Sequence, residues 1–158
     1  MVWLVTVQWL HVLLGVVWFG GTLYINLILI PSLLPLPREK QQEVSARIGP
    51  MTTRVLRPAA ILVIVFGFIR GTFLGQLHSA QEVVGTTYGM TWLIALIGTL
   101  ALFAFTELVL EPAVSHLNIA KEEAEYSATL RRVQVVSVIQ LLGFFAIFTC
   151  MVLMRFGL

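Results

Sequence analysis

The sequence predicts an all-α integral membrane protein that folds as an antiparallel four-helix bundle. Of its 158 residues, 58% are hydrophobic and only 11% are charged, and the mean hydropathy is +0.93. So few polar side chains could not cover the surface of a soluble domain. The apolar residues also form four runs, each near the roughly 20 residues that a membrane-crossing helix requires. We expect one transmembrane domain over residues 1–158, with helices at about 2–30, 52–74, 88–112 and 130–156.

Prolines and glycines predict where these helices end. The first helix is expected to stop at Pro31, and a short interfacial helix over about 38–48 is expected to stop at Gly49 and Pro50, because proline lacks the amide hydrogen that a continuing helix needs. Residues 75–89, which include His78, are predicted to form a loop. An acidic loop precedes the fourth helix.

The basic residues predict the orientation of the bundle. They gather in two connecting segments, which leaves only two arginines on the other side of the membrane, Arg70 and Arg155. By the positive-inside rule the two basic segments face the cytoplasm of a multi-pass protein in the cell (inner/cytoplasmic) membrane, and both termini lie outside. The net charge of +2 is not concentrated in one patch, so we expect no nucleic-acid partner.

His11 is the most informative residue of the chain, because it lies inside the first apolar run. An ionisable side chain within a membrane span is a candidate functional residue. Helical spacing predicts that a polar or small stripe shares its face and packs against protein: Gln8, Gly15, Trp18, Thr22 and Asn26. A second inward stripe is expected on the fourth helix: Gln134, Ser137, Gln140, Gly143 and Phe144.

A neutral imidazole beside a glycine suits haem b, because the imidazole supplies a lone pair for iron and Gly15 leaves room for a flat ring. Trp18 could form a wall of that site, and Arg70 could pair with the propionates. His78 is the candidate second axial ligand, provided that its loop dips into the bundle.

Two other interpretations of these residues stay open. His11 could be a packed, hydrogen-bonded histidine in a haem-free membrane scaffold. Alternatively, soft ligands near the outer end could hold copper, and these are Cys150, Met151, Met154, Met90 and His78. Glu107 is expected to form an ion pair with Arg54 or Arg57, with proton transfer as the alternative.

Two sequence patterns resemble a known superfamily. The first helix reads H-x6-W-x2-G-x2-Y from His11, and the second reads M-x2-R-x3-P-x8-G from Met51 to Gly67. With Trp92 and Leu93 of the third helix, they resemble the small four-helix membrane proteins that include HemJ-type protoporphyrinogen oxidases and the membrane domain of CopD-type copper proteins. The resemblance implies a four-helix bundle in which His11 is a haem-b ligand or its near equivalent.

The third helix departs from the pattern of the protoporphyrinogen oxidases. Their W-L-H-x-K arrangement has a histidine and a lysine where this chain has Ile94 and Leu96. Protoporphyrinogen oxidation is therefore disfavoured, and a different haem-dependent oxidoreductase activity is left open.

The predicted function is redox. A single haem can pass electrons between a membrane quinol, or another redox partner, and an acceptor on the outer side without a catalytic acid or base. The chain contains no aspartate, so many hydrolytic sites are excluded. Gly20 and Gly21 on the first helix could let two copies pack as a homo-oligomer.

Overall fold

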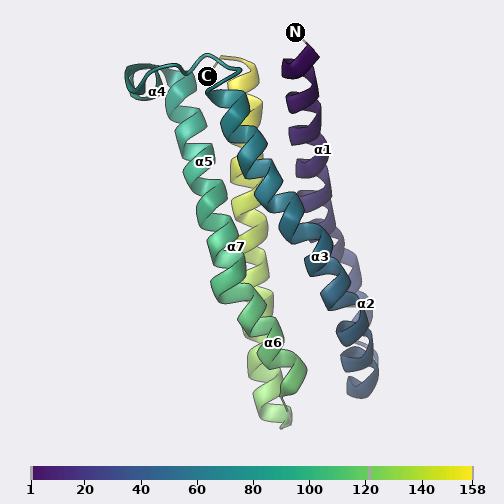
Figure 1. Cartoon of the computed structure of the whole chain (residues 1–158). Coiled ribbons are helices and arrows are strands. Elements are labelled where there is room, and N and C mark those ends of the chain that lie inside the picture. The colour runs from purple at the N-terminus through teal and green to yellow at the C-terminus, as the bar shows by residue number, and fades with distance from the viewer. Residues whose placement is uncertain (1, 121, 158) are drawn as a thin grey trace.

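The computed structural model describes residues 2–120 and 122–157, and within these ranges all regular structure is helical (Figure 1). Four of its helical stretches are long and apolar enough to cross a membrane: Val2–Leu33, Arg38–Gly71, Thr87–Ile119 and Glu123–Arg155. The predicted all-α four-helix bundle is confirmed, and the chain is a multi-pass membrane protein.

The elements follow one another as α1 (Val2–Tyr24), η1 (Ile25–Leu29), α2 (Ile30–Leu33), α3 (Arg38–Gly71), α4 (Ala80–Gly85), α5 (Thr87–Phe105), η2 (Thr106–Leu110), α6 (Glu111–Ile119) and α7 (Glu123–Arg155). The start of α1, the end of α7 and α4 lie together at one end of the bundle, here called the termini end (Figure 1). The opposite end, with α2, α6 and the start of α3, is called the basic end.

The bundle consists of two helical hairpins. α1 packs along α3, and α5 packs along α7, while contacts from α3 to α5 and from α1 to α7 are fewer. Each hairpin also has the same plan, since a long helix passes through a π-helical segment and then a proline before the chain turns back. The two hairpins therefore share the same order of elements, although no repeat in the sequence predicts it.

The two π-helical segments explain why the first and third spans continue past their prolines. Pro31 follows η1 and Pro112 follows η2, each as the second residue after the segment ends. A proline ring clashes with the carbonyl four residues earlier, and the wider turn of a π-helix relieves that clash. The predicted ends near residues 30 and 112 were therefore too early, and the helices run on to Leu33 and Ile119.

The second span corrects another prediction. The expected interfacial helix over 38–48 and the helix from 52 are one continuous element, α3, which runs through Gly49 and Pro50. A proline in a helix costs roughly 3 kcal/mol. The first turns of α3 are held in place at the basic end by tertiary contacts, and these offset that cost.

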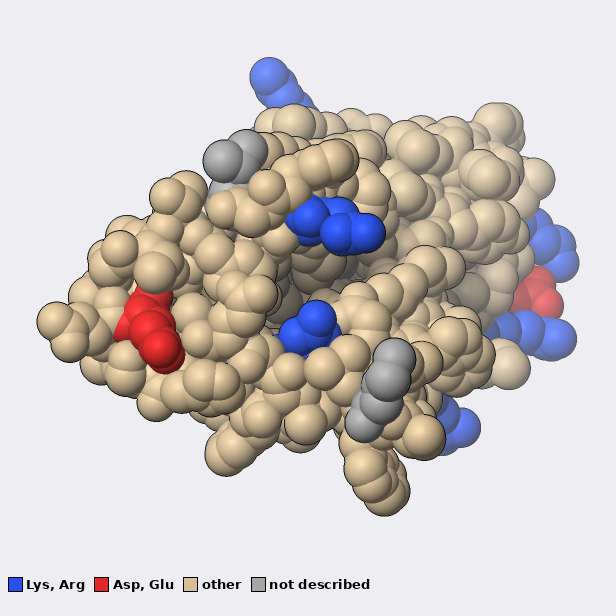
Figure 2. Space-filling model, turned by 90° about the horizontal axis from the view of Figure 1, so that it is seen from above, with Lys and Arg blue, Asp and Glu red and all other residues tan. Residues whose placement is uncertain are grey.

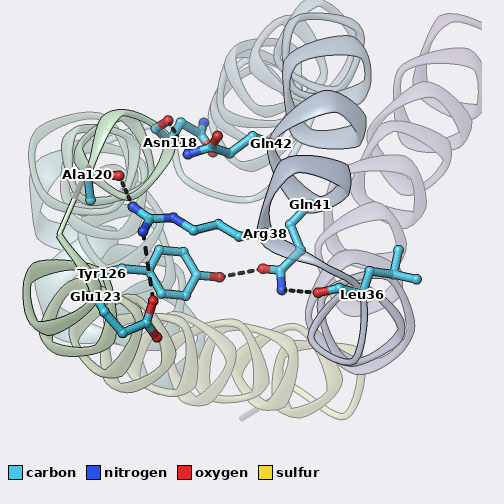
Figure 3. A network of polar contacts seen from close by, with 8 residues as sticks. All are labelled: Leu36, Arg38, Gln41, Gln42, Asn118, Ala120, Glu123 and Tyr126. Atoms are coloured by element: carbon cyan, nitrogen blue, oxygen red, sulfur yellow. Dashed lines mark hydrogen bonds and ion pairs between the residues drawn. The ribbon is translucent and has the colours of Figure 1, made fainter.

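These contacts form a network that ties the start of α3 to the segment between α6 and α7 (Figure 3). The Arg38 guanidinium donates to the Ala120 carbonyl, lies 3.8 Å from a Glu123 carboxylate oxygen and sits 4.8 Å from the centre of the Tyr126 ring. The Tyr126 hydroxyl donates to Gln41 Oε1. Gln42 Nε2 donates to the Asn118 carbonyl at 3.2 Å. The network joins the two hairpins at the basic end.

The predicted loop over 75–89 contains a helix, α4, which the sequence analysis missed. Ser79 Oγ accepts from the Glu82 N–H at 3.2 Å, and Glu82 Oε2 accepts from the Ser79 N–H at 3.0 Å. This is a capping box, and its S-x-x-E pattern is visible in the sequence. The His78 N–H also donates to Glu82 Oε2, at 2.6 Å. Chiefly because of this bond, the pKa of Glu82 is lowered from its ordinary value of 4.5.

The core lies where the predicted inward stripes meet. Trp18 and Phe144 are 5% exposed, and their rings pack edge to face with centroids 4.7 Å apart. Thr22 and Gln140 are buried in the same half of the bundle, so both stripes are confirmed at these positions. The buried residues that form one contiguous cluster here are Trp18, Ala59, Ala60, Val63, Leu102, Phe144 and Ile147.

Two predictions need adjustment, one for the inward stripe of the fourth helix and one for the glycines of the first helix. Gln134 was expected to face inward, but its side chain is exposed, one turn from the polar basic end. Gly21 does not form an open face, because an added Cβ would lie 2.6 Å from Leu56 Cδ2. Gly20 is different, since an added Cβ there would meet nothing within 4 Å.

Candidate functional site

His11 lies against α3 in the half of the bundle next to the termini end. Its Nδ1 is 3.0 Å from the carbonyl oxygen of Val63. A carbonyl oxygen only accepts hydrogen bonds, so this contact requires the proton on Nδ1. In the neutral ring Nε2 then carries an unshared lone pair, which is the state that a metal ligand needs.

Gly67 makes this position of the imidazole possible. A Cβ built on Gly67 would lie 2.9 Å from His11 Cε1 and 3.4 Å from Nδ1. Separations under 3.0 Å do not occur without a shift of the neighbouring group, so any larger residue at 67 would displace the ring. The backbone of α3 therefore forms a close-fitting floor for His11.

A polar pair lies one helical turn from His11 toward the termini end. Arg70 Nε donates to Gln8 Oε1 at 2.9 Å, and Gln8 precedes His11 by three residues on α1. This single bond uses one of the five guanidinium N–H groups of Arg70. The remaining donors can bind an anionic group close to the imidazole.

The termini end is hollowed near its middle, between two groups of basic side chains, as Figure 2 shows. The arginines carried by the transmembrane helices that reach this end are Arg70 of α3 and Arg155 of α7. Positive charge at the mouth of a hollow attracts anions from the water outside. The surface of the termini end around these arginines is thus suited to carboxylates.

Gly15 and Trp18, the predicted site residues on the side of His11 toward the basic end, have different surroundings. An added Cβ on Gly15 would meet nothing within 4 Å, so there is open space beside the helix one turn from His11. Trp18 is instead committed to the core through its contact with Phe144. The predicted wall of aromatic character next to His11 is therefore absent at Trp18, which anchors the helix below the site.

The structure does not bring His78 together with His11. The His78 side chain is exposed, and its backbone N–H is taken up by the Glu82 carboxylate that caps α4. In Figure 1, α4 lies beyond α5 from α1. The residue of this loop that enters the protein is the neighbouring Leu77, which is 5% exposed. The loop does not dip as a second ligand from His78 would require.

The candidate copper ligands are also spread over different surfaces. Cys150 lines an apolar groove of about 350 Å³ between α5 and α7, whereas Met90 and His78 are exposed near the start of α5. Among residues 2–120 and 122–157 there is no group of three or more histidine, cysteine or acidic residues that could hold a metal ion. Haem iron differs in this respect, because its porphyrin supplies four of the ligands.

Glu107 has the ion-pair partner that the sequence predicted. Arg57 Nε donates to Glu107 Oε1 at 2.9 Å and Arg57 Nη2 donates to Oε2 at 2.6 Å, so the pair is bidentate. It joins α3 to η2 near the basic end. The partner is Arg57, whose guanidinium fork matches the two oxygens of the carboxylate.

Two features of the interior were missed by sequence reasoning. The Val63 carbonyl belongs to an ordinary apolar residue, and no side-chain pattern identifies it as the partner of His11. Gln140 donates from Nε2 to Thr106 Oγ1 at 2.7 Å, while its buried Oε1 has no hydrogen-bond donor among the described residues. Its place in a polar stripe was the only signal for it.

Comparisons with family models, with curated proteins and with solved structures found no match to this chain. The resemblance to the HemJ and CopD superfamily therefore stays a prediction from the sequence patterns.

Proposed function

We propose that this protein binds haem b through His11 Nε2 and transfers electrons within the membrane. The observation that carries the proposal is the environment of the imidazole. Its Nδ1–H donates to a backbone carbonyl, 3.0 Å away, and Gly67 holds the ring against α3. A second hydrogen bond of this kind is the usual means by which a protein orients a metal-ligating histidine and raises its basicity.

The residues on either side of His11 suit the porphyrin ring and the carboxylates of haem. Open space at Gly15 leaves room for a flat ring, and Arg70 at the termini end can pair with a carboxylate turned toward water. Neither hollow lined by α7, one of about 350 Å³ and one of about 180 Å³, includes His11. The residues that would hold the ring are therefore His11 and the open side of the helix at Gly15.

Bound haem would supply reversible one-electron chemistry at iron. The chain's own part is to hold the ring, to orient the imidazole through Val63, and to keep water from the iron with apolar side chains. The described transmembrane interior offers no second ionisable group beside His11 that could act as its acid or base; the Arg57–Glu107 pair lies toward the basic end. A quinol, or another donor in the membrane, is the proposed source of electrons.

The orientation follows from charge. We place the basic end in the cytoplasm of a cell membrane and both termini outside, because lysines and arginines in short loops favour the cytoplasmic side. Electrons would then leave from the outer side, where the site opens. The open face at Gly20 supports close packing of a second copy as a homo-oligomer.

The test is to purify the protein in detergent from cells supplied with haem, and to record visible spectra in the oxidised and reduced states with pyridine extraction. We expect a b-type haem in the wild-type protein and loss of most of it in His11→Ala. The matched control is His116→Ala, which changes an exposed histidine at the basic end and should keep full haem content.

Circular dichroism shows whether each variant keeps its helices. A colourless wild-type protein, or full haem content with an unchanged spectrum in His11→Ala, would overturn the proposal. The first outcome would instead indicate that His11 is a packing residue bonded to Val63.

A further inference from the structure

A hollow of about 180 Å³ lies toward the basic end, with η1 and α2 on one side and α7 on the other. Most of its lining is apolar, but Asn26 of η1 and Ser137 of α7 also line it. Leu27 and Val138, one from each side, are more than half exposed. In a membrane-spanning bundle such apolar exposure faces lipid, so the hollow opens toward the bilayer.

Ser137 lines this hollow with a hydroxyl group that has no partner. The residue is only 6% exposed, yet its hydroxyl makes no hydrogen bond within the part of the chain that the structure describes. The buried Thr22 and Thr99 instead donate to the carbonyls four residues earlier, at 2.9 and 2.6 Å. An unpaired hydroxyl is costly away from water. A ligand oxygen in the hollow could accept this hydrogen bond.

Asn26 provides a second donor from the other side of the hollow. Its Nδ2 donates to the Thr22 carbonyl at 2.9 Å, which uses one of the two N–H groups of the amide. The other N–H is left for a ligand. The hollow thus has hydrogen-bond donors on both sides and hydrocarbon around them, an arrangement that suits ester carbonyl groups attached to acyl chains.

Positive charge lies next to the hollow at its basic end. Arg131 precedes Gln134 by three residues and Val138 by seven, and both of these line the hollow, so Arg131 shares their side of α7. Arg131 is exposed and has no ion-pair partner among residues 2–120 and 122–157. From Arg131 to Leu141 the helix rises about 15 Å. Along this distance the side chains change from a cation through an amide and a hydroxyl to hydrocarbon.

We propose that an anionic phospholipid binds in this hollow. Its phosphate lies at Arg131, its ester carbonyl oxygens accept from Ser137 and Asn26, and an acyl chain packs against Leu27 and Leu141. The order of groups along α7 matches the order of groups in such a lipid, from the headgroup into the membrane. Basic pockets between transmembrane helices bind anionic lipid headgroups for this reason. The proposal does not depend on haem.

The test is native mass spectrometry of the detergent-purified protein with equal amounts of phosphatidylglycerol and phosphatidylcholine that carry the same acyl chains. We expect the wild-type protein to retain phosphatidylglycerol in preference. Arg131→Gln should lower this binding about fivefold, the usual effect of one basic residue near an anionic headgroup. Arg132→Gln is the matched control, because Arg132 lies at nearly the same depth but about 100° further round the helix. It should bind like the wild type.

Ser137→Ala separates the hydroxyl from the charge. It should weaken the binding of both lipids, because both have ester carbonyls, and it should leave the preference for phosphatidylglycerol intact. Thr149→Val is its control, since that hydroxyl is exposed and bonded to the Phe145 carbonyl at 2.8 Å. Circular dichroism shows whether each variant keeps its helices.

Three results would overturn the proposal. One is equal binding of the two lipids by the wild-type protein, and another is equal loss in the two arginine variants, which would indicate attraction to the whole basic end. The third is a co-purified neutral quinone or other neutral lipid that blocks phosphatidylglycerol. Unchanged binding by Ser137→Ala would contradict the part assigned to its hydroxyl.

Discussion

Gly67 shows how a residue without a side chain sets the position of the imidazole. Because Gly67 has no side chain, the His11 ring can approach α3 closely enough to reach the Val63 carbonyl one turn away. The sequence pattern from Met51 to Gly67 had drawn attention to this glycine. Its partner could be identified only after the two helices were placed side by side.

Gly67→Ala is expected to displace His11, because the new Cβ would lie 2.9 Å from Cε1. Overpacking of this kind costs about 1–3 kcal/mol, and it would lengthen the bond from Nδ1 to Val63. We expect weaker retention of haem and a shifted Soret band, measured on the purified variant. Gly49→Ala is the control, since a Cβ at this helical position would meet nothing within 4 Å. Equal haem retention in both variants would contradict the role assigned to Gly67.

At the scale of the element, α4 is a short helix that depends on its cap. Its six residues cannot form a stable helix alone, because helix nucleation is unfavourable and few hydrogen bonds follow it. The Glu82 carboxylate accepts from two backbone N–H groups, of His78 and Ser79. The charge state of Glu82 should therefore control whether α4 is ordered.

The pH dependence of α4 follows in sign from the lowered pKa of Glu82. A carboxyl group whose pKa is lower in the folded state stabilises that state at pH values above its ordinary value of 4.5. This contribution is lost as the pH falls through the lowered value. Hydrogen-exchange protection of residues 78–86 should be constant near neutral pH and should decrease below about pH 4.

Glu82→Gln is the control for this behaviour. The variant should show weaker protection of the same segment at neutral pH, with no further loss on acidification, because its amide does not titrate. Protection that stays constant in the wild-type protein down to strongly acidic pH would show that the cap does not order α4.

The long helices show that a proline in the sequence does not always mark a helix end. Pro31 and Pro50 predicted helix ends, and both lie within continuous helical stretches, as does Pro112. Pro31 and Pro112 follow π-helical turns, and Pro50 lies in a helix whose first turns are held by contacts at the basic end. In a membrane the backbone gains more from continuing its hydrogen bonds than in water, where solvent can replace them.

At the scale of the whole molecule, two hairpins are joined by a few specific contacts. Arg57 and Glu107 connect α3 to η2 within the bundle. The Arg38 network connects the start of α3 to the segment between α6 and α7 (Figure 3). Because apolar side chains gain little by leaving lipid for another helix, such polar contacts weigh more in a membrane bundle than in a soluble one.

Tyr126→Phe tests the contribution of this network. The substitution removes the hydroxyl that donates to Gln41 but keeps the ring beneath Arg38. Loss of one hydrogen bond should lower the free energy of unfolding by about 1 kcal/mol, measured by denaturant titration in detergent. Tyr24→Phe, at an exposed position on α1, should have a smaller effect. If both variants unfold at the same denaturant concentration, the network does not stabilise the joined hairpins.

The sequence by itself determined the class of this protein and the inward faces of its helices. Apolar runs of this length require a membrane, and the helical period then brings Trp18, Thr22, Ser137 and Gln140 to the interior. It also singled out His11, because an imidazole in an apolar run is costly unless it has a partner.

Only the tertiary structure decided what that partner is. Val63 contributes a backbone carbonyl, and nothing in the sequence distinguishes it from its apolar neighbours. Its role comes from the register between α1 and α3, which is seen in the close approach at Gly67. Spacing along one helix predicts a face, whereas the alignment of two helices depends on how their side chains fit together.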